Sequence, residues 1–134
     1  MILIIQKEVA QRITAKSPYS NLLAISVQFY ASAEIIDYVK KESFWPKPKV
    51  DAAIIKIIPK KKPPQKTRNA FFAALKAGFS QPRKQLIGNL SKKLNISKEN
   101  IVSIFKDLKI PTMARAENLS LNHWQKLASK LIHK

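Results

Sequence analysis

Apolar and polar positions in the first part of the chain predict a strand followed by two helices. The continuous apolar run at residues 2–5 contains three isoleucines, which favours a strand buried on both faces of a parallel sheet. Residues 6–14 place Val9 and Ile13 four positions apart among charged residues, the spacing of an amphipathic helix. Residues 19–30 carry apolar positions around most of a helical circumference, so we expect a largely covered second helix.

Two further runs, residues 33–39 and 51–58, are rich in residues that favour strands, and residues 40–50 separate them. We expect them to be antiparallel neighbours that close the edge of the sheet, with the connection projecting from one end. A central strand needs a neighbour on each side, yet no strand precedes residues 2–5. The chain is therefore expected to be the tail of a larger α/β protein.

Residues 59–66 read Pro-Lys-Lys-Lys-Pro-Pro-Gln-Lys, which neither continues a sheet nor buries, so they are interpreted as a linker. Beyond them the apolar period becomes helical, and Ser97 and Ser120 are suitable N-caps for the last two helices. The apolar stripes are expected to form the core of a helical domain over residues 67–134. Their members are Phe71, Phe72, Leu75, Phe79, Leu86, Ile87, Leu90, Leu94, Ile101, Ile104 or Phe105, Leu108, Leu121, Trp124, Ala128 and Leu131.

The net charge of +17 is unevenly distributed along the chain. Residues 1–58 hold eight Lys/Arg and five Asp/Glu, whereas the rest holds seventeen and three, which makes the second part the polyanion binder. Arg83 and Lys84 are expected in the first turn of a helix, where cations oppose the helix dipole. They are therefore candidates for phosphate binding, and Lys92 and Lys93 near the end of that helix extend the basic face.

The aromatic loop, which we define as residues 44–51, reads Phe-Trp-Pro-Lys-Pro-Lys-Val-Asp. Its prolines hold the backbone extended, so Phe44 and Trp45 can present their rings. Rings beside lysines stack on nucleobases while the cations hold adjoining phosphates, which makes Lys47 and Lys49 candidates for RNA binding. The alternative is that Phe44 and Trp45 simply plug the edge of a core.

Several kinds of site are not expected. The chain has no cysteine, and His123 and His133 lie far from any matching carboxylate cluster, so no metal site is predicted. Its two glycines fall within expected helices, so no glycine-rich loop can cradle a cofactor, and no catalytic triad or carboxylate pair is evident. The opening apolar run is too short for a signal peptide or a membrane span, and we expect a cytoplasmic protein.

Five motifs in order resemble the C-terminal part of the small-subunit ribosomal RNA adenine N6-dimethyltransferases. The resemblance covers nearly the whole chain. The motifs are Gln6-Lys7-Glu8-Val9-Ala10 with Arg12-Ile13, Gln28-Phe29-Tyr30, the aromatic loop with Ala52-Ala53, Ala77-Gly78-Phe79-Ser80-Gln81 with Arg83-Lys84, and Arg115-Ala116-Glu117-Asn118-Leu119-Ser120.

The resemblance implies the last strands and helices of a doubly wound methyltransferase sheet over residues 1–58, followed by a small all-α RNA-binding domain. It also implies stacking of Phe44 and Trp45 on a target adenine turned out of its RNA. The family uses S-adenosylmethionine, but its glycine-rich loop and its Asn-Leu-Pro-Tyr catalytic motif are absent from this chain. We therefore expect the chain alone to bind no cofactor, to hold no catalytic residue and to be inactive.

The implied partner is small-subunit ribosomal RNA in immature small subunits. One alternative is a non-enzymatic RNA-binding or ribosome-assembly module, and another is a DNA-binding helical domain with Arg83 and Lys84 on a recognition helix. Because the strand at residues 2–5 lacks a neighbour, we expect the first half of the chain either to be marginally stable or to be stabilised by self-association through exposed sheet edges.

Overall fold

The computed structural model describes residues 1–132, and His133 and Lys134 lie outside the described part. The described residues form six α-helices and one three-stranded sheet. They make two compact units. The first comprises Met1–Ala15 and Leu23–Lys62, and the second comprises Lys16–Leu22 and the chain from Pro63 onward. None of the described helices is long and apolar enough to cross a membrane.

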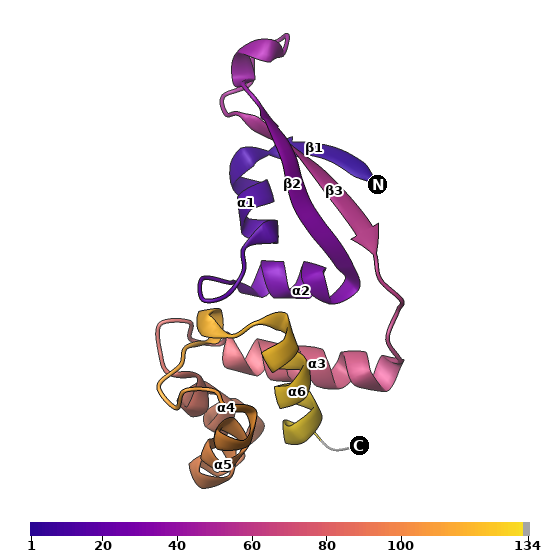
Figure 1. The fold of residues 1–134 in the computed structure, drawn as a ribbon. Coiled ribbons are helices and arrows are strands. Elements are labelled where there is room, and N and C mark those ends of the chain that lie inside the picture. The colour runs from indigo at the N-terminus through magenta and orange to yellow at the C-terminus, as the bar shows by residue number, and fades with distance from the viewer. Residues whose placement is uncertain (133–134) are drawn as a thin grey trace. The chain divides into compact units, whose positions relative to one another are not determined.

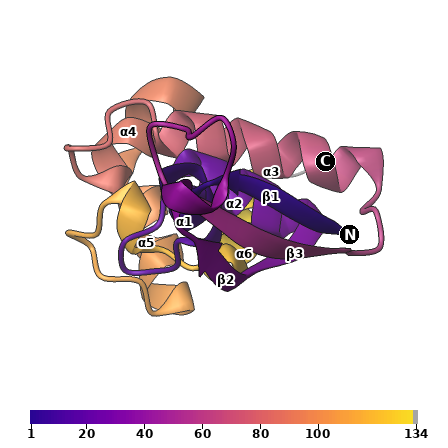
Figure 2. The same cartoon turned by 90° about the horizontal axis from the view of Figure 1, so that it is seen from above.

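The sheet of the first unit has the strand order β1-β3-β2, which can be followed in Figure 2. Its strands are β1 (Ile2–Gln6), β2 (Ala31–Val39) and β3 (Ala52–Pro59). Strands β2 and β3 pair in antiparallel register from Ala31–Pro59 to Val39–Ala52, with a shift after Ile35. The predicted antiparallel pair is therefore confirmed, and the connection between the strands projects beyond one end of the sheet (Figure 1).

Strand β1 differs from the prediction of a doubly buried parallel strand. It pairs antiparallel with β3, and Met1 and Ile57 exchange backbone hydrogen bonds of 2.8 and 3.1 Å. Because bonded pairs alternate along an antiparallel ladder, the backbone groups of Ile2, Ile4 and Gln6 point away from β3. Among the described residues nothing pairs with that edge, and the side chains of Ile2 and Ile4 are exposed. An apolar run shows that a strand prefers burial, but it does not encode the direction of pairing.

Two helices accompany the sheet. Helix α1 (Lys7–Thr14) contacts all three strands and buries Ala10 completely, and Gln28 of α2 (Leu22–Tyr30) donates to the carbonyls of Ile13 and Ala15 at 3.1 and 2.9 Å. The predicted second helix starts three residues later than expected. It is also less covered than expected, since its buried residues are Ala24, Ile25 and Phe29, whereas its exposed large apolar residues are Leu22, Leu23 and Tyr30.

The second unit is a helical bundle (Figure 1). Its helices are α3 (Gln65–Gly78), α4 (Leu86–Leu94), α5 (Lys98–Leu108) and α6 (Leu121–Leu131), with a 3-10 turn, η2, at Ala116–Asn118. Helices α3 and α5 each contact both α4 and α6. The largest fully buried side chains at their centre are Phe71, Leu75, Leu86, Leu90, Ile101, Phe105, Leu119, Trp124 and Leu127. The predicted caps are confirmed, because Ser97 Oγ accepts from the amide of Asn100 and Ser120 Oγ from that of His123.

Trp124 packs directly over the end of α3. Its side chain is fully buried, and its ring stacks on Phe79 with centroids 5.5 Å apart. A Cβ atom at Gly78 would lie 3.0 Å from Trp124 Cζ3, closer still to Trp124 Cη2, and 2.8 Å from Leu86 Cδ1. The packing therefore requires glycine at position 78.

The segment Lys16–Leu22 belongs to the helical unit although it lies between two stretches of the first unit in the sequence. The amide of Ser20 donates to the carbonyl of Glu117 at 2.9 Å, and Asn118 Nδ2 donates to the carbonyl of Pro18 at 3.1 Å. These bonds attach the segment to η2 and its neighbours.

Two predicted boundaries move. The expected linker at residues 59–66 shortens to residues 60–64, because Pro59 ends β3 and Gln65 begins α3. Arg83 and Lys84 do not lie in the first turn of α4 but in the turn before it, since α4 begins at Leu86. The helix-dipole argument therefore does not apply to these two residues.

Candidate nucleic-acid interface

The helical unit carries a pocket of about 730 Å³, which we call the basic pocket. Its cationic lining residues come from four segments of the chain: the turn before α4, α4 itself, the start of α5, and the stretch before η2. They are Arg83, Lys84, Lys92, Lys98 and Arg115. The lining contains no aspartate or glutamate, so the pocket concentrates positive charge.

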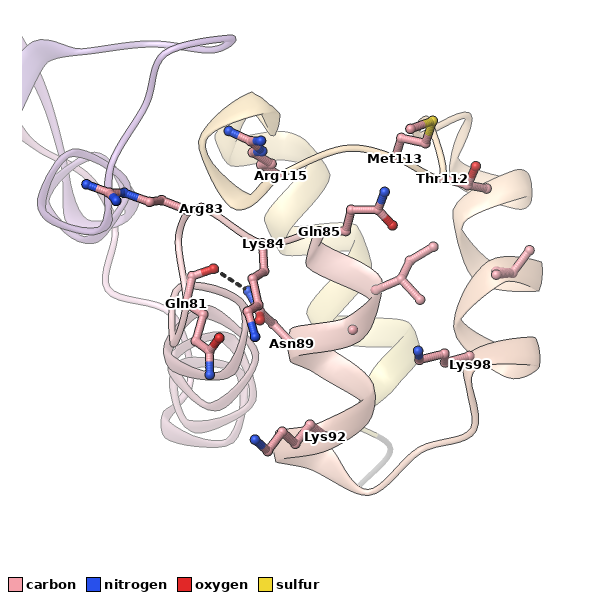
Figure 3. Close-up of a pocket in the computed structure, with 13 residues that line it drawn as sticks. Gln81, Arg83, Lys84, Gln85, Asn89, Lys92, Lys98, Thr112, Met113 and Arg115 are labelled. Carbon is pink, nitrogen blue, oxygen red and sulfur yellow. Dashed lines mark hydrogen bonds between the residues drawn. The ribbon is translucent and has the colours of Figure 1, made fainter.

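The cations lie around the rim of the pocket rather than converging on one point (Figure 3). Lys98 extends from α5 towards α4, whereas Arg83 and Lys92 are directed outward. The lining also contains the uncharged residues Ile87, Gly88 and Val102. Dispersed cations with uncharged residues between them suit an extended polyanion better than a small enclosed ion.

A buried asparagine holds the turn that carries Arg83 and Lys84. Asn89 is 5% exposed, and its Nδ2 donates to the carbonyls of Gly78 and Gln81, each at 2.9 Å. One of these bonds is visible in Figure 3. The amide of Lys84 also donates to the carbonyl of Gln81 at 3.0 Å. The two cations thus project from a turn that is fixed at its base.

The opposite side of the pocket is tied to the start of α4. The amide of Leu86 donates to the carbonyl of Ala114 at 2.9 Å, and the amide of Arg115 donates to Asn118 Oδ1 at 2.8 Å. The carbonyl and the amide of the Ala114–Arg115 peptide are therefore both hydrogen-bonded. The position of Arg115 beside α4 therefore follows from the fold.

The structure brings three of the predicted basic residues of this unit together and adds two. Arg83, Lys84 and Lys92 line the basic pocket, whereas Lys93 is exposed on α4 outside its lining. Sequence reasoning missed Lys98 and Arg115. Lys98 is a cation in the first turn of α5, which was a usable signal, but only the folded backbone brings Arg115 to the same site.

The rim cations of the basic pocket are not neutralised by carboxylates in the described part of the chain. An ion pair between Lys47 Nζ and Glu42 Oε1, at 3.7 Å, lies in the first unit and not in the basic pocket. Both of its side chains are exposed, so it contributes little to stability. The charge of the basic pocket remains available to a polyanion.

The aromatic loop lines a second pocket, of about 790 Å³, within the first unit. Trp45 is 96% exposed and therefore is not a core residue, while Phe44 is half-buried. Both rings line this pocket together with Lys49 and with Ile4 and Ile5 of β1. Lys47 does not line it and faces Glu42 instead.

Asp51 holds the ends of the connection that carries the aromatic loop. Its Oδ1 accepts from the amide of Lys41 at 3.0 Å, and its carbonyl accepts from the amide of Lys7 at 3.0 Å. The connection also contains a 3-10 turn, η1 (Lys41–Ser43). The rings are thus presented from an anchored base.

The residues of this chain do not fit an adenosyl cofactor or a metal ion. Both glycines, Gly78 and Gly88, lie in helices of the second unit, so the first unit has no glycine with which to build a loop around a cofactor. Within residues 1–132 no group of three or more His, Cys, Asp or Glu side chains could hold a metal ion.

Solved structures share this fold. The match to a dimethyladenosine transferase from Plasmodium falciparum covers 94% of this chain and 54% of the transferase chain, with a TM-score of 0.73 and 25% sequence identity. The match to the 23S rRNA methyltransferase ErmE covers 97% of this chain and 53% of the ErmE chain, with a TM-score of 0.77. Its sequence identity is 17%, so this match shows similarity of fold alone. The fold is therefore similar to that of about half of each of these methyltransferases.

The sequence narrows this class to one family. The family model described as Ribosomal RNA adenine dimethylase matches residues 1–133, and the chain belongs to that family. Curated relatives called Ribosomal RNA small subunit methyltransferase A are 40% identical in Dehalococcoides mccartyi strain CBDB1, 40% in Onion yellows phytoplasma and 34% in Geobacillus sp. strain WCH70. These matches cover 95, 96 and 99% of this chain. The chain spans only 44 to 48% of the relatives' length.

Proposed function

We propose that this chain is the RNA-recognition part of an enzyme that dimethylates adenines of small-subunit ribosomal RNA during ribosome maturation. The observation that carries the proposal is the basic pocket, five cations with no carboxylate among them. Phosphate contacts supply most of the affinity of proteins for nucleic acid and require unpaired cations of this kind. The relatives' printed names indicate ribosomal RNA as the polyanion.

In this proposal the two pockets divide the work of recognition. The basic pocket and Lys93 hold phosphates, and Lys47 and Lys49 hold those nearest the target base. Trp45 or Phe44 stacks on the adenine that leaves its base stack, an interaction of about 1 to 3 kcal/mol. The high exposure of Trp45 suits a stacking platform, because a ring in water gains most when a base covers it.

No chemical step is assigned to this chain. The enzyme family uses S-adenosylmethionine, and the residues present here do not fit that cofactor, so we propose that the chain alone binds no cofactor and transfers no methyl group. It would act in the cytoplasm on immature small ribosomal subunits. The same absence of cofactor residues favours a second candidate, a non-enzymatic RNA-binding module of ribosome assembly.

We also propose that this chain associates with itself through the free edge of β1. Residues 1–6 carry no charged side chain or proline that would discourage strand pairing. The unpaired backbone groups of Ile2, Ile4 and Gln6 provide the hydrogen-bonding edge. A second copy of β1 could pair there.

The binding proposal is tested with an in vitro transcript of small-subunit ribosomal RNA and duplex DNA as competitor. The double variant Arg83→Ala/Lys84→Ala should bind the transcript about tenfold more weakly or worse. It should also lower the slope of log affinity against log salt by about 1.5, because two phosphate contacts are lost. Lys61→Ala/Lys62→Ala removes the same charge from the exposed linker and is the matched control. Equal losses in the two variants, or equal competition by DNA, would contradict the proposal.

The division of labour is tested by methyl transfer from labelled S-adenosylmethionine to immature small ribosomal subunits. This chain should transfer nothing, whereas a chain extended by the upstream half of a relative should be active. In the extended chain, Trp45→Ala or Phe44→Ala should reduce transfer while general RNA affinity is kept. Inactivity of the extended chain, with RNA binding intact, would favour the non-enzymatic candidate.

A further inference from the structure

The two glycines of the helical unit occur in helices, but only one of them has a reason in the packing. Gly78 is required because Trp124 and Leu86 occupy the space of a Cβ atom. At Gly88 an added Cβ would meet nothing within 4 Å, and the residue does not have a positive φ. The fold therefore accepts alanine at position 88 without strain.

A glycine inside a helix is unfavourable, because it loses more backbone freedom on folding than alanine does. Gly88 is the third residue of α4, whose caps are Gln85 and Asn95, so it cannot be assigned to a turn or a cap. The remaining common use of glycine is to let another molecule approach the backbone closely. Gly88 lines the basic pocket, and an added Cβ atom there would meet only open space.

We propose that Gly88 is an RNA-binding residue, at which the sugar-phosphate backbone of a bound RNA lies directly against helix α4. This inference rests on the proposed function and adds to it a contact that carries no charge. The surrounding chemistry fits such a ligand. Cations line the pocket rim for the phosphates, and Gln85 and Thr112 offer hydrogen-bonding groups for ribose hydroxyls.

The position of Gly88 between cations from separate segments supports an extended ligand. Arg83 and Lys84 precede α4, Lys92 follows Gly88 by one helical turn, and Lys98 approaches from α5. An RNA backbone that contacts Lys84 or Lys92 on one side of α4 and Lys98 on the other would pass the pocket that Gly88 lines. A methyl group on that face would hold the backbone away from the helix and weaken several phosphate contacts together.

The test is the variant Gly88→Ala, measured for thermal unfolding and for binding to the small-subunit ribosomal RNA transcript. Its unfolding temperature should rise by about 2 to 6 °C, because alanine favours the helix. Its affinity for RNA should fall about tenfold. The slope of affinity against salt should stay near that of the unmodified chain, since no charge is removed.

Ser103→Ala on α5 is the matched control, because Ser103 is exposed within a helix and does not line the basic pocket. It should leave RNA affinity unchanged. If Gly88→Ala binds RNA normally while Arg83→Ala/Lys84→Ala binds poorly, the inference is wrong and the proposed function stands. If neither variant binds more weakly, the proposed function itself is wrong. A lower unfolding temperature for Gly88→Ala would show a structural role for the glycine and would also overturn the inference.

Discussion

The substitution Gly78→Ala probes the tightest packing in the helical unit. The new methyl group would lie 2.8 Å from Leu86 Cδ1 and 3.0 Å from Trp124 Cζ3, with Trp124 Cη2 closer still. Leu86 can shift the end of its side chain, but the Trp124 ring is rigid, fully buried and stacked on Phe79. The ring or the end of α3 must therefore move.

Overpacking of this kind costs about 1 to 3 kcal/mol, and alanine returns about 0.5 to 1 kcal/mol through its helix propensity. We therefore expect Gly78→Ala to lower the free energy of unfolding by about 1 to 2 kcal/mol. Urea denaturation followed by tryptophan fluorescence measures this directly. A Trp45→Phe background is useful, because Trp45 is almost fully exposed and Trp124 would then be the single reporter.

Two further variants separate the steric cause from a general effect of alanine. Replacing Trp124 by phenylalanine removes the part of the ring that obstructs the methyl group, so Gly78→Ala should cost less in that background, as measured by circular dichroism. Gly88→Ala should instead gain about 0.5 to 1 kcal/mol. If Gly78→Ala were as stable as the unmodified chain, the reasoning from Trp124 packing would be refuted.

Two other perturbations follow from contacts described above. Asn89→Ala removes the donor to the carbonyls of Gly78 and Gln81, so urea denaturation should show a free energy of unfolding lower by about 1 to 3 kcal/mol. Because these bonds hold the turn that carries Arg83 and Lys84, the variant should also bind RNA more weakly. Unchanged stability would show that the two bonds are dispensable. Ile4→Lys places a charge on the exposed strand β1, which should prevent pairing with a second copy. In sedimentation equilibrium the apparent mass of the unmodified chain should rise with concentration, whereas the variant should stay monomeric. A monomeric unmodified chain would contradict self-association.

Local signals in the sequence predicted what depends on neighbouring residues. The caps at Ser97 and Ser120 follow from the residue types at the helix starts, and the antiparallel pair β2–β3 follows from two runs of strand-favouring residues joined by a short connection. The pairing direction of β1 did not, because its partner β3 lies some fifty residues away and an apolar run is compatible with either direction.

The sequence predicted only part of the basic pocket, because contacts between distant segments bring its residues together. Arg83 and Lys84 were identified by charge, but their turn is set by Asn89, whose side chain reads as an ordinary polar position on a helix. Arg115 comes to the pocket through the bond between Leu86 and Ala114, which joins segments that no periodicity connects. Contacts of this range depend on the folded backbone.

The segment Lys16–Leu22 has a consequence for how such proteins can be rearranged. Because its bonds to Glu117 and Asn118 make it part of the helical unit, that unit is not a continuous stretch of the gene. A recombination at residues 60–64 would transfer the donor's helices and η2 turn without the donor's residues 16–22, which hydrogen-bond to that turn. The loop and the helices must therefore be exchanged together, so a chimera joined at residues 60–64 should carry the donor's version of residues 16–22 as well.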